Sequence, residues 1–178
     1  LMGANPDVAF VIPEANRAFI ADRLQRDADR PTGLSDGEST TIKGVDFFGI
    51  TAAHEDLSRD ENGKCHFMGF VARIGPWTLY HSGDSILHDG LVEQLNGFNI
   101  DVAFLPINGS IPERNVAGNF DGAEAAQLAR DIGATLVIPC HYDLFEFNTA
   151  TTDLFEESCT SMQQEFEVME NGERITLE

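Results

Sequence analysis

Three residues of types that bind metal ions each stand at the end of an apolar run in this 178-residue chain. The segment "FFGITAAHE" presents His54, "WTLYHSGDS" presents Asp84, and "TLVIPCHYD" presents His141. In each segment a strand-like run gives way to small or turn residues, and an imidazole or a carboxylate follows. These groups hold zinc, manganese or iron in proteins, and stiff strand ends fix their geometry. The shared pattern therefore indicates a metal-dependent site.

Each of these positions also has an ordinary structural explanation. A single histidine after a strand is more often a hydrogen-bonded structural residue than a ligand, and Ser-Gly-Asp is common turn chemistry. Gly83 would let the backbone before Asp84 pass close to an ion or to another loop. The three strand ends taken together are more specific than any one of them alone.

Other polar residues near these strand ends are weaker candidates. Asn108, in "PINGS", follows a strand and could orient a substrate oxyanion, although an Asn-Gly turn explains it equally well. Cys140 directly precedes His141, and adjacent strand residues point to opposite faces, so we expect Cys140 to be a buried thiol that faces the core. We interpret His81 as a structural residue or a support for a ligand.

The remaining pattern predicts a mixed sheet covered by helices. Hairpins around Lys43-Gly44 and Gly75-Pro76 and several apolar runs place strands at 8–12, 40–51, 65–74, 77–81, 101–106 and 135–140. Helices are expected at 14–30, 87–96, 121–133 and 153–163, a loop at 31–39, and a hairpin pairing 165–168 with 174–177. Asp121 and Glu124 form a capping-box pattern at the start of the third helix. Active sites of such folds collect at strand ends, where the candidate ligands stand.

These segments resemble a known family, the metallo-β-lactamase-fold hydrolases, and within it the L-ascorbate-6-phosphate lactonase-like branch. The resemblance covers nearly the whole chain and is carried by "GITAAHE", "GFVARIGPWTLYHSGDS", "DVAFLPINGS", "VAGNFDGAEAAQLARDIGA" and "VIPCHYDLFEFNT". It implies an α/β protein with an αβ/βα sandwich. It also implies that His54 is a metal ligand, that Asp84 bridges two metal positions, and that His141 is a ligand of the second.

The activity that this resemblance implies is metal-dependent hydrolysis of a small molecule. A divalent metal, Zn or Mn, lowers the pKa of bound water and polarises the electrophile. Metal-bound hydroxide would attack a lactone, ester or phosphoester of a small substrate such as a phosphorylated sugar acid. Asp84 and Asn108 are the residues expected to act in catalysis.

The chain departs from the family pattern at its first signature. The motif His-x-His-x-Asp-His should lie just before the strand expected at 8–12, yet the first histidine of the chain is His54. With His54, Asp84 and His141 alone, each metal position keeps about two protein ligands, fewer than the three of a usual catalytic zinc site. We expect residues 1–178 to be one partial domain of a longer protein, lacking the N-terminal part of its β-layers. The alternative is a catalytically inactive homologue that serves as an assembly or binding subunit.

Composition narrows the possible partners. The chain has 30 acidic and 11 basic residues and a formal net charge of −19, so its surface repels nucleic acid and anionic lipid. No apolar run reaches the length of a membrane span, and the three cysteines do not suggest a disulfide scaffold. We therefore expect a cytoplasmic protein with a small-molecule substrate, no nucleic-acid or membrane partner, and assembly into a homo-oligomer that covers an open sheet face.

Overall fold

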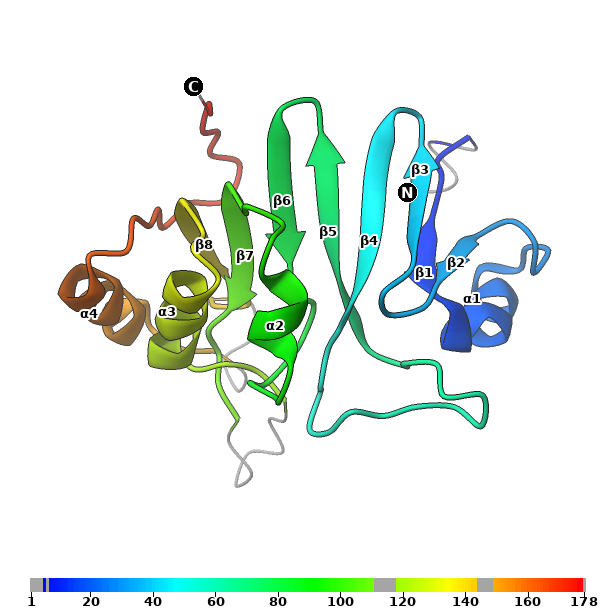
Figure 1. Ribbon diagram of the computed structural model, residues 1–178, viewed down its shortest axis with the longest axis horizontal. Helices are drawn as coiled ribbons and strands as arrows, with labels where there is room; N and C mark the ends of the chain where they lie inside the picture. Colours follow the sequence, from blue (N-terminus) through cyan, green and yellow to red (C-terminus); the bar gives the residue numbers. More distant parts are fainter. Residues whose placement is uncertain (1–4, 6, 111–117, 144–148, 178) are drawn as a thin grey trace.

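The structure, a computed structural model, describes residues 5, 7–110, 118–143 and 149–177. Its centre is a six-stranded sheet in the order β3-β4-β5-β6-β7-β8, with helices against it (Figure 1). The strands of this sheet are β3 (Ser39–Ile42), β4 (Val45–Thr51), β5 (Met68–Ile74), β6 (Trp77–His81), β7 (Val102–Pro106) and β8 (Leu136–Cys140). The helices beside it are α2 (Leu91–Leu95), α3 (Gly122–Asp131) and α4 (Asp153–Met162). The expected α/β class is confirmed.

The directions of the strands bring four strand ends to one edge of the sheet. Strands β3 to β6 pair antiparallel in sequence, whereas β6, β7 and β8 pair parallel. It follows that β4, β6, β7 and β8 all run the same way, and their carboxyl ends meet at the lower edge of the sheet in Figure 1. The candidate residues follow these four strands, so the topology gathers them at this edge.

The main core lies between the sheet and the three helices. Alternate residues of the central strands point to this side, among them Val71, Tyr80, Ala103 and Val137, each fully buried. The amphipathic helix α3 packs Ala125, Ala126, Leu128 and Ala129 against them, and α4 adds Phe155 and Cys159. The capping box predicted at Asp121 and Glu124 is present in full, because each side chain accepts a hydrogen bond from the other residue's backbone amide.

A smaller unit lies beside the other end of the sheet. Strands β1 (Val11–Pro13) and β2 (Thr32–Leu34) pair parallel, and a 3-10 turn, Glu14–Asn16, leads from β1 into α1 (Arg17–Leu24). A second apolar cluster of Leu34, Cys65 and Met68 joins this unit to the sheet, with Val11, Phe47 and Phe70 packed around it.

Two expectations for the first 40 residues are wrong. The helix expected at 14–30 ends at Leu24, because Gln25 adopts a left-handed conformation with φ of 50°. The side chain of Arg17 then holds the following chain by donating to the carbonyls of Ala28 and Pro31, at 2.6 and 2.9 Å. The loop expected at 31–39 contains strand β2, whose Leu34 is buried in the second cluster.

The hairpin expected at 165–168 with 174–177 is also absent from the described residues. The turn itself forms, with the amide of Glu173 donating to the carbonyl of Glu170 at 3.0 Å. The two arms do not pair, because Phe166 makes a parallel bridge to Val137 at the edge of β8 instead. Its ring packs edge-on against Phe155 with centroids 5.6 Å apart, so burial of an aromatic ring decides the path of this segment.

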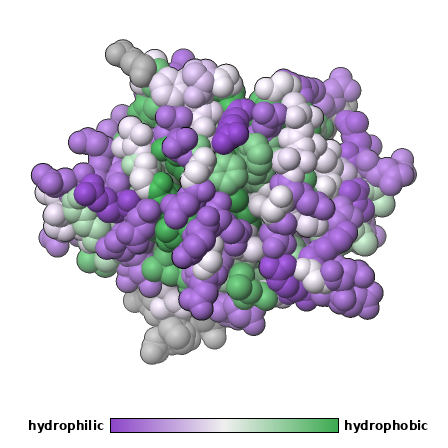
Figure 2. Space-filling model, in the orientation of Figure 1, coloured by the Kyte–Doolittle hydropathy of each residue, from purple (hydrophilic) through white to green (hydrophobic). Residues whose placement is uncertain are grey.

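The surface agrees with the acidic composition. In the orientation of Figure 1, most of the visible surface is hydrophilic, and apolar side chains show between the polar ones near the middle (Figure 2). None of the helices in the described part of the chain is long and apolar enough to cross a membrane.

Candidate metal centre

Hydrogen bonds hold the segments that carry the candidate residues against one another. The amide of Ile86 donates to the carbonyl of Ala53 at 2.8 Å, and the amide of Ala53 donates to Oγ of Ser85 at 3.0 Å. The segments that carry His54 and Asp84 are therefore direct neighbours. The amide of Ile107 donates to the carbonyl of Cys140 at 3.1 Å, which places the residues that follow, Asn108 and His141, on adjacent segments in the same way.

Asp84 and His141 form a pair. Nε2 of His141 lies 3.7 Å from Oδ2 of Asp84, and the two side chains are 20% and 47% exposed for His141 and Asp84 respectively. His141 adopts a left-handed backbone conformation with φ of 60°, which turns its side chain out of the strand alternation of β8. Its Nδ1 is buried, and the described residues offer it no hydrogen-bond partner. A carboxylate and an imidazole at this separation can share a cation.

His54 is oriented by a backbone carbonyl. Its Nδ1 lies 3.3 Å from the carbonyl oxygen of Gly118, and a carbonyl can only accept, so Nδ1 is the nitrogen that carries the hydrogen. In the neutral ring Nε2 is then unprotonated, which is the form that binds a metal, and the carbonyl acts as the outer partner that fixes such a ligand. The ring also meets Phe67 edge-on, with centroids 5.4 Å apart.

The donor set fits a divalent metal in kind but is short in number. Asp84, His141 and His54 are oxygen and nitrogen donors of the type that zinc and manganese accept. Among the residues that the structure describes, however, no three His, Cys, Asp or Glu side chains lie close enough to hold one ion. The structure brings Asp84 and His141 together as a pair and places His54 on the segment next to Asp84.

Of the two neighbouring residues Cys140 and His81, Cys140 departs from expectation and His81 agrees with it. Cys140 is half-buried and belongs to neither apolar cluster, so it does not face the core as expected; Val137 faces the helices, and Cys140 lies on the opposite side of β8. Burial raises the pKa of its thiol to about 12, and the charge of Asp84 adds to the effect, so the thiol stays protonated. His81 accepts a hydrogen bond from the amide of Gly83 at 2.9 Å, a structural role as expected.

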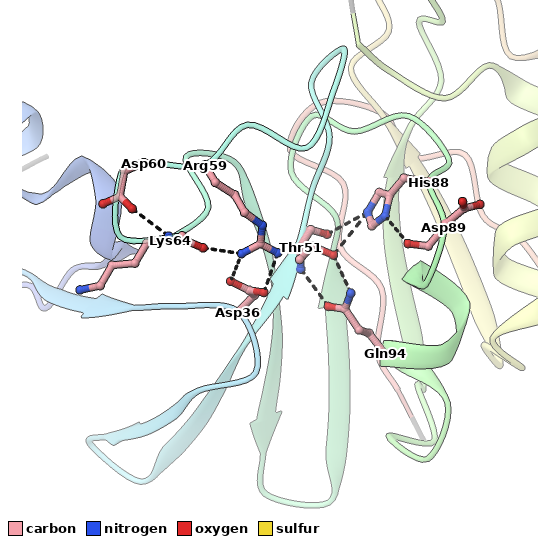
Figure 3. A network of polar contacts seen from close by, with 9 residues as sticks. Asp36, Thr51, Arg59, Asp60, Lys64, His88, Asp89 and Gln94 are labelled. Carbon is pink, nitrogen blue, oxygen red and sulfur yellow. Dashed lines mark hydrogen bonds and ion pairs between the residues drawn. The ribbon is translucent and has the colours of Figure 1, made fainter.

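A clamp that the sequence did not reveal ties the end of β4 to the segment after Asp84 (Figure 3). Gln94 of α2 accepts from the amide of Thr51 at 3.1 Å and donates to its hydroxyl at 2.7 Å. Nε2 of His88 lies 3.5 Å from the same hydroxyl and 3.4 Å from the carbonyl of Thr51. Thr51 precedes His54 by three residues and His88 follows Asp84 by four, so this clamp sets the spacing of the two candidate ligands.

The loop between β4 and β5 is fixed at a second point, also drawn in Figure 3. The guanidinium of Arg59 donates to both oxygens of Asp36, at 3.1 and 3.0 Å, and to the carbonyl of Gly63 at 2.6 Å. This hydrogen bonding lowers the pKa of the Asp36 carboxyl, so the ion pair persists below neutral pH. The loop that begins at His54 is therefore anchored at its middle.

Replacing Gln94 with leucine should weaken the candidate centre from a distance. The buried amide of Thr51 would lose its acceptor, which costs about 1–3 kcal/mol of unfolding free energy. Because the spacing of His54 and Asp84 would relax, we expect metal affinity to fall about tenfold. Chemical denaturation and metal titration of Gln94→Leu measure both effects. The control is Glu93→Leu on the exposed side of α2, and equal losses in the two variants would contradict the clamp.

A cleft of about 530 Å³ opens beside one of the candidate residues, Asn108. Asn108 and Asn119 line it, each with 2% of its surface exposed, so the predicted Asn108 does face a cleft. The remaining walls come from the segments after Asp84 and after β7, from the start of α3 and from the residues around the start of α4: Ile86, Leu87, Ile107, Gly109, Ser110, Asp121, Gly122, Glu124, Ala150, Thr151 and Leu154. Such a concave, partly apolar space next to polar groups is typical of a small-molecule site.

Comparison with known proteins places the chain in a family. Residues 6–142 match the model of the beta-lactamase superfamily domain. A protein named UPF0173 metal-dependent hydrolase from Rubrobacter xylanophilus is 32% identical over 151 residues, which cover 80% of this chain and 59% of that protein. One of the same name from Methanosphaerula palustris is 35% identical over 134 residues, 71% of this chain and 57% of the relative. The chain thus spans somewhat more than half the length of these relatives.

Solved structures share the fold at low sequence identity. A metallo hydrolase from the archaeon Ignicoccus hospitalis superposes with a TM-score of 0.75 at 20% identity, covering 99% of this chain and 71% of that one. An isothiocyanate hydrolase from Delia radicum gut bacteria gives a TM-score of 0.74 at 13% identity, covering 96% and 67%. With the match of the family model, these likenesses show that the chain belongs to the beta-lactamase superfamily and has the metallo-β-lactamase fold.

Proposed function

We propose that this chain carries part of the active site of a divalent-metal-dependent hydrolase, with His54, Asp84 and His141 as metal ligands. The observation that carries the proposal is the pairing of Asp84 with His141 at 3.7 Å, at the same sheet edge where a carbonyl fixes His54. The names of the relatives, metal-dependent hydrolases, support the same activity. A bound Zn or Mn would supply a Lewis acid and lower the pKa of water.

The roles of the chain's own residues follow from their positions. Asp84 and His141 would hold the metal ion between them, and His54 would add an imidazole nitrogen whose tautomer is set by Gly118. Asn108 lies at the adjoining cleft and would orient the oxygen on which negative charge develops. We propose a small lactone, ester or phosphoester as substrate, in the manner of lactonases such as those that act on L-ascorbate 6-phosphate.

We propose a cytoplasmic homo-oligomer that binds neither nucleic acid nor membrane, since the net charge of −19 repels polyanions and the described helices cannot cross a bilayer.

Metal analysis of the protein tests the proposal. After purification and dialysis against Mn²⁺ or Zn²⁺, we expect bound metal and hydrolysis of a lactone or ester that EDTA abolishes. His141→Ala should lose both. Retention of hydrolysis in EDTA, or absence of bound metal in the wild type, would count against a metal hydrolase.

One observation favours a second function. Because the described residues hold no group of three ligand side chains, the protein could be a homologue without catalysis that serves as an assembly or binding subunit. This alternative predicts a stable, metal-free oligomer whose melting temperature does not respond to Zn²⁺ or Mn²⁺.

A further inference from the structure

The turn that carries His141 contains two residues in a backbone conformation that is unfavourable for side chains with a Cβ. His141 has φ of 60° and Asp143 has φ of 52°, so both are left-handed although neither is glycine. The amide of Asp143 donates to Oγ1 of Thr149 at 2.6 Å. Residues keep such a conformation only where contacts around them enforce it, so the surroundings of the turn 141–143 hold it in place.

The ring of His141 contributes little to its own position. Its Nε2 lies 3.7 Å from Oδ2 of Asp84, beyond the length of a good hydrogen bond, and its buried Nδ1 has no hydrogen-bond partner among the described residues. A cavity of about 720 Å³ also borders the turn, lined by 139–143, Thr152 and 168–172. With open space on that side, the place of the ring depends on how the backbone before and after it is fixed.

Hydrogen bonds fix this backbone on both sides of the ring. Before it, the carbonyl of Cys140 accepts from the amide of Ile107 at 3.1 Å. After it, the hydroxyl of Tyr142 donates to the carbonyl of Met169 at 2.8 Å. Tyr142 lies between the two left-handed residues of the turn, and its ring packs against the main core. The phenol therefore ties the turn to a segment 27 positions further along the chain.

That segment, residues 165–169, is a strap along the edge of β8. Val137 donates to the carbonyl of Glu165 at 3.0 Å and accepts from the amide of Glu167 at 3.1 Å. The pairing is parallel, so the strap leads toward the carboxyl end of β8. There Met169 presents its carbonyl to the phenol. The strand before the turn and the residue inside the turn are thus held by one and the same segment.

We propose that Tyr142 is a positioning residue for the candidate ligand His141, and that the strap 165–169 is the support against which it holds the turn. The inference rests on the proposed function, because the place of this imidazole affects hydrolysis only if His141 binds the metal. Phenylalanine at position 142 would keep the ring that packs on the core and remove only the hydroxyl. Loss of that one group should therefore displace the imidazole of His141 while the core stays intact.

Tyr142→Phe and Tyr80→Phe form a matched pair, because the chain has two tyrosines. The hydroxyl of Tyr80 is buried in the core without a hydrogen-bond partner among the residues that the structure describes, so its removal breaks no such bond. Proton–carbon NMR signals of the histidine rings are recorded on the metal-free protein in EDTA. His141→Ala identifies the His141 signal among the five histidines. We expect Tyr142→Phe to shift or split this signal and Tyr80→Phe to leave it in place.

Metal titration gives the second measurement on the same variants. We expect Tyr142→Phe to bind Zn²⁺ or Mn²⁺ about tenfold more weakly than the wild type, at the lower end of the loss that follows removal of groups that orient metal ligands. Tyr80→Phe should keep the wild-type affinity. Both variants should still melt cooperatively in EDTA, which verifies folding.

Three outcomes would overturn the proposal. These are an unchanged His141 signal in Tyr142→Phe, an equal change of that signal in Tyr80→Phe, and wild-type metal affinity in Tyr142→Phe when the wild type binds metal. Because the NMR measurement needs no metal, it also separates this role from the proposed function. A wild type that binds no metal, together with a displaced His141 signal in Tyr142→Phe, retains the positioning role and contradicts the metal hydrolase instead.

Discussion

Asp84→Asn should abolish the thermal stabilisation that Zn²⁺ or Mn²⁺ gives to the protein. In the wild type, metal at about 100 times its dissociation constant adds about 2.7 kcal/mol to the unfolding free energy. For a chain of this size that raises the melting temperature by about 5–10 °C. Asn keeps the shape of the side chain but lacks the negative charge, so a centre built on Asp84 and His141 loses its main attraction for a cation.

The same substitution should leave the metal-free protein almost unchanged. The Asp84 side chain is 47% exposed, and an ion pair of this kind contributes about 0–1 kcal/mol. Differential scanning fluorimetry with and without metal separates the two effects. His141→Ala should behave in the same way, with metal affinity reduced at least about a hundredfold, since even outer partners of ligands cost 10- to 100-fold.

Glu157→Gln supplies the matched control. It removes one carboxylate from the exposed side of α4, so it changes net charge equally without touching the candidate centre. If metal stabilises Asp84→Asn as strongly as it stabilises Glu157→Gln, then Asp84 is not a ligand and the metal binds elsewhere.

Local chemistry explains why much of the fold could be predicted. The hairpin at Lys43-Gly44 formed as expected because both residues adopt positive φ, of 51° and 82°, in a two-residue turn between β3 and β4. The capping box at Asp121 and Glu124 lies within four consecutive residues, and the amphipathic pattern that follows has a single face to bury. Each of these signals depends on neighbours in the sequence alone.

The sequence could name candidate residues for the site but not the contacts that support them. His54, Asp84, Asn108 and His141 could be named because strand ends of a mixed sheet meet at one edge. The hydrogen bonds that brace them join residues far apart: Gln94 and Thr51 are 43 positions apart, and His54 and Gly118 are 64. No periodicity records such contacts, which exist only once the sheet has assembled.

The prediction that Cys140 faces the core was wrong for a related reason. Strand alternation does not state which face of a sheet carries the helices, and His141 lies beyond the end of β8, where alternation no longer applies. In the structure the side chain of Val137 points to the face of the sheet that the helices cover, so Cys140 lies on the opposite face and is half-buried. The φ of 60° at His141 could not be expected either, since a residue other than glycine is rarely left-handed.

Gly118→Ala should disturb the candidate centre directly, through His54. Gly118 has φ of 74°, and a Cβ built on it would lie 2.7 and 2.8 Å from the backbone carbon and Cα of His54, with Nδ1 of the ring still closer. Backbone cannot yield as a flexible side chain does, so His54 must move. We expect a loss of about 2–4 kcal/mol in unfolding free energy, from backbone strain of about 1 kcal/mol and overpacking of about 1–3 kcal/mol.

Gly37→Ala separates these two contributions. Gly37 has a similar φ of 78°, but a Cβ there would meet nothing within 4 Å, so this variant carries the strain without the overlap. In urea denaturation, the losses of unfolding free energy in the two variants should therefore differ by the contribution of the overlap alone, about 1–3 kcal/mol. Metal titration should show normal affinity in Gly37→Ala and at least about a tenfold loss in Gly118→Ala, because the displaced His54 also loses the carbonyl that fixes its tautomer. Equal stability and equal metal affinity in the two variants would mean that His54 does not need its contact with Gly118. That result would contradict the assignment of His54 as a metal ligand.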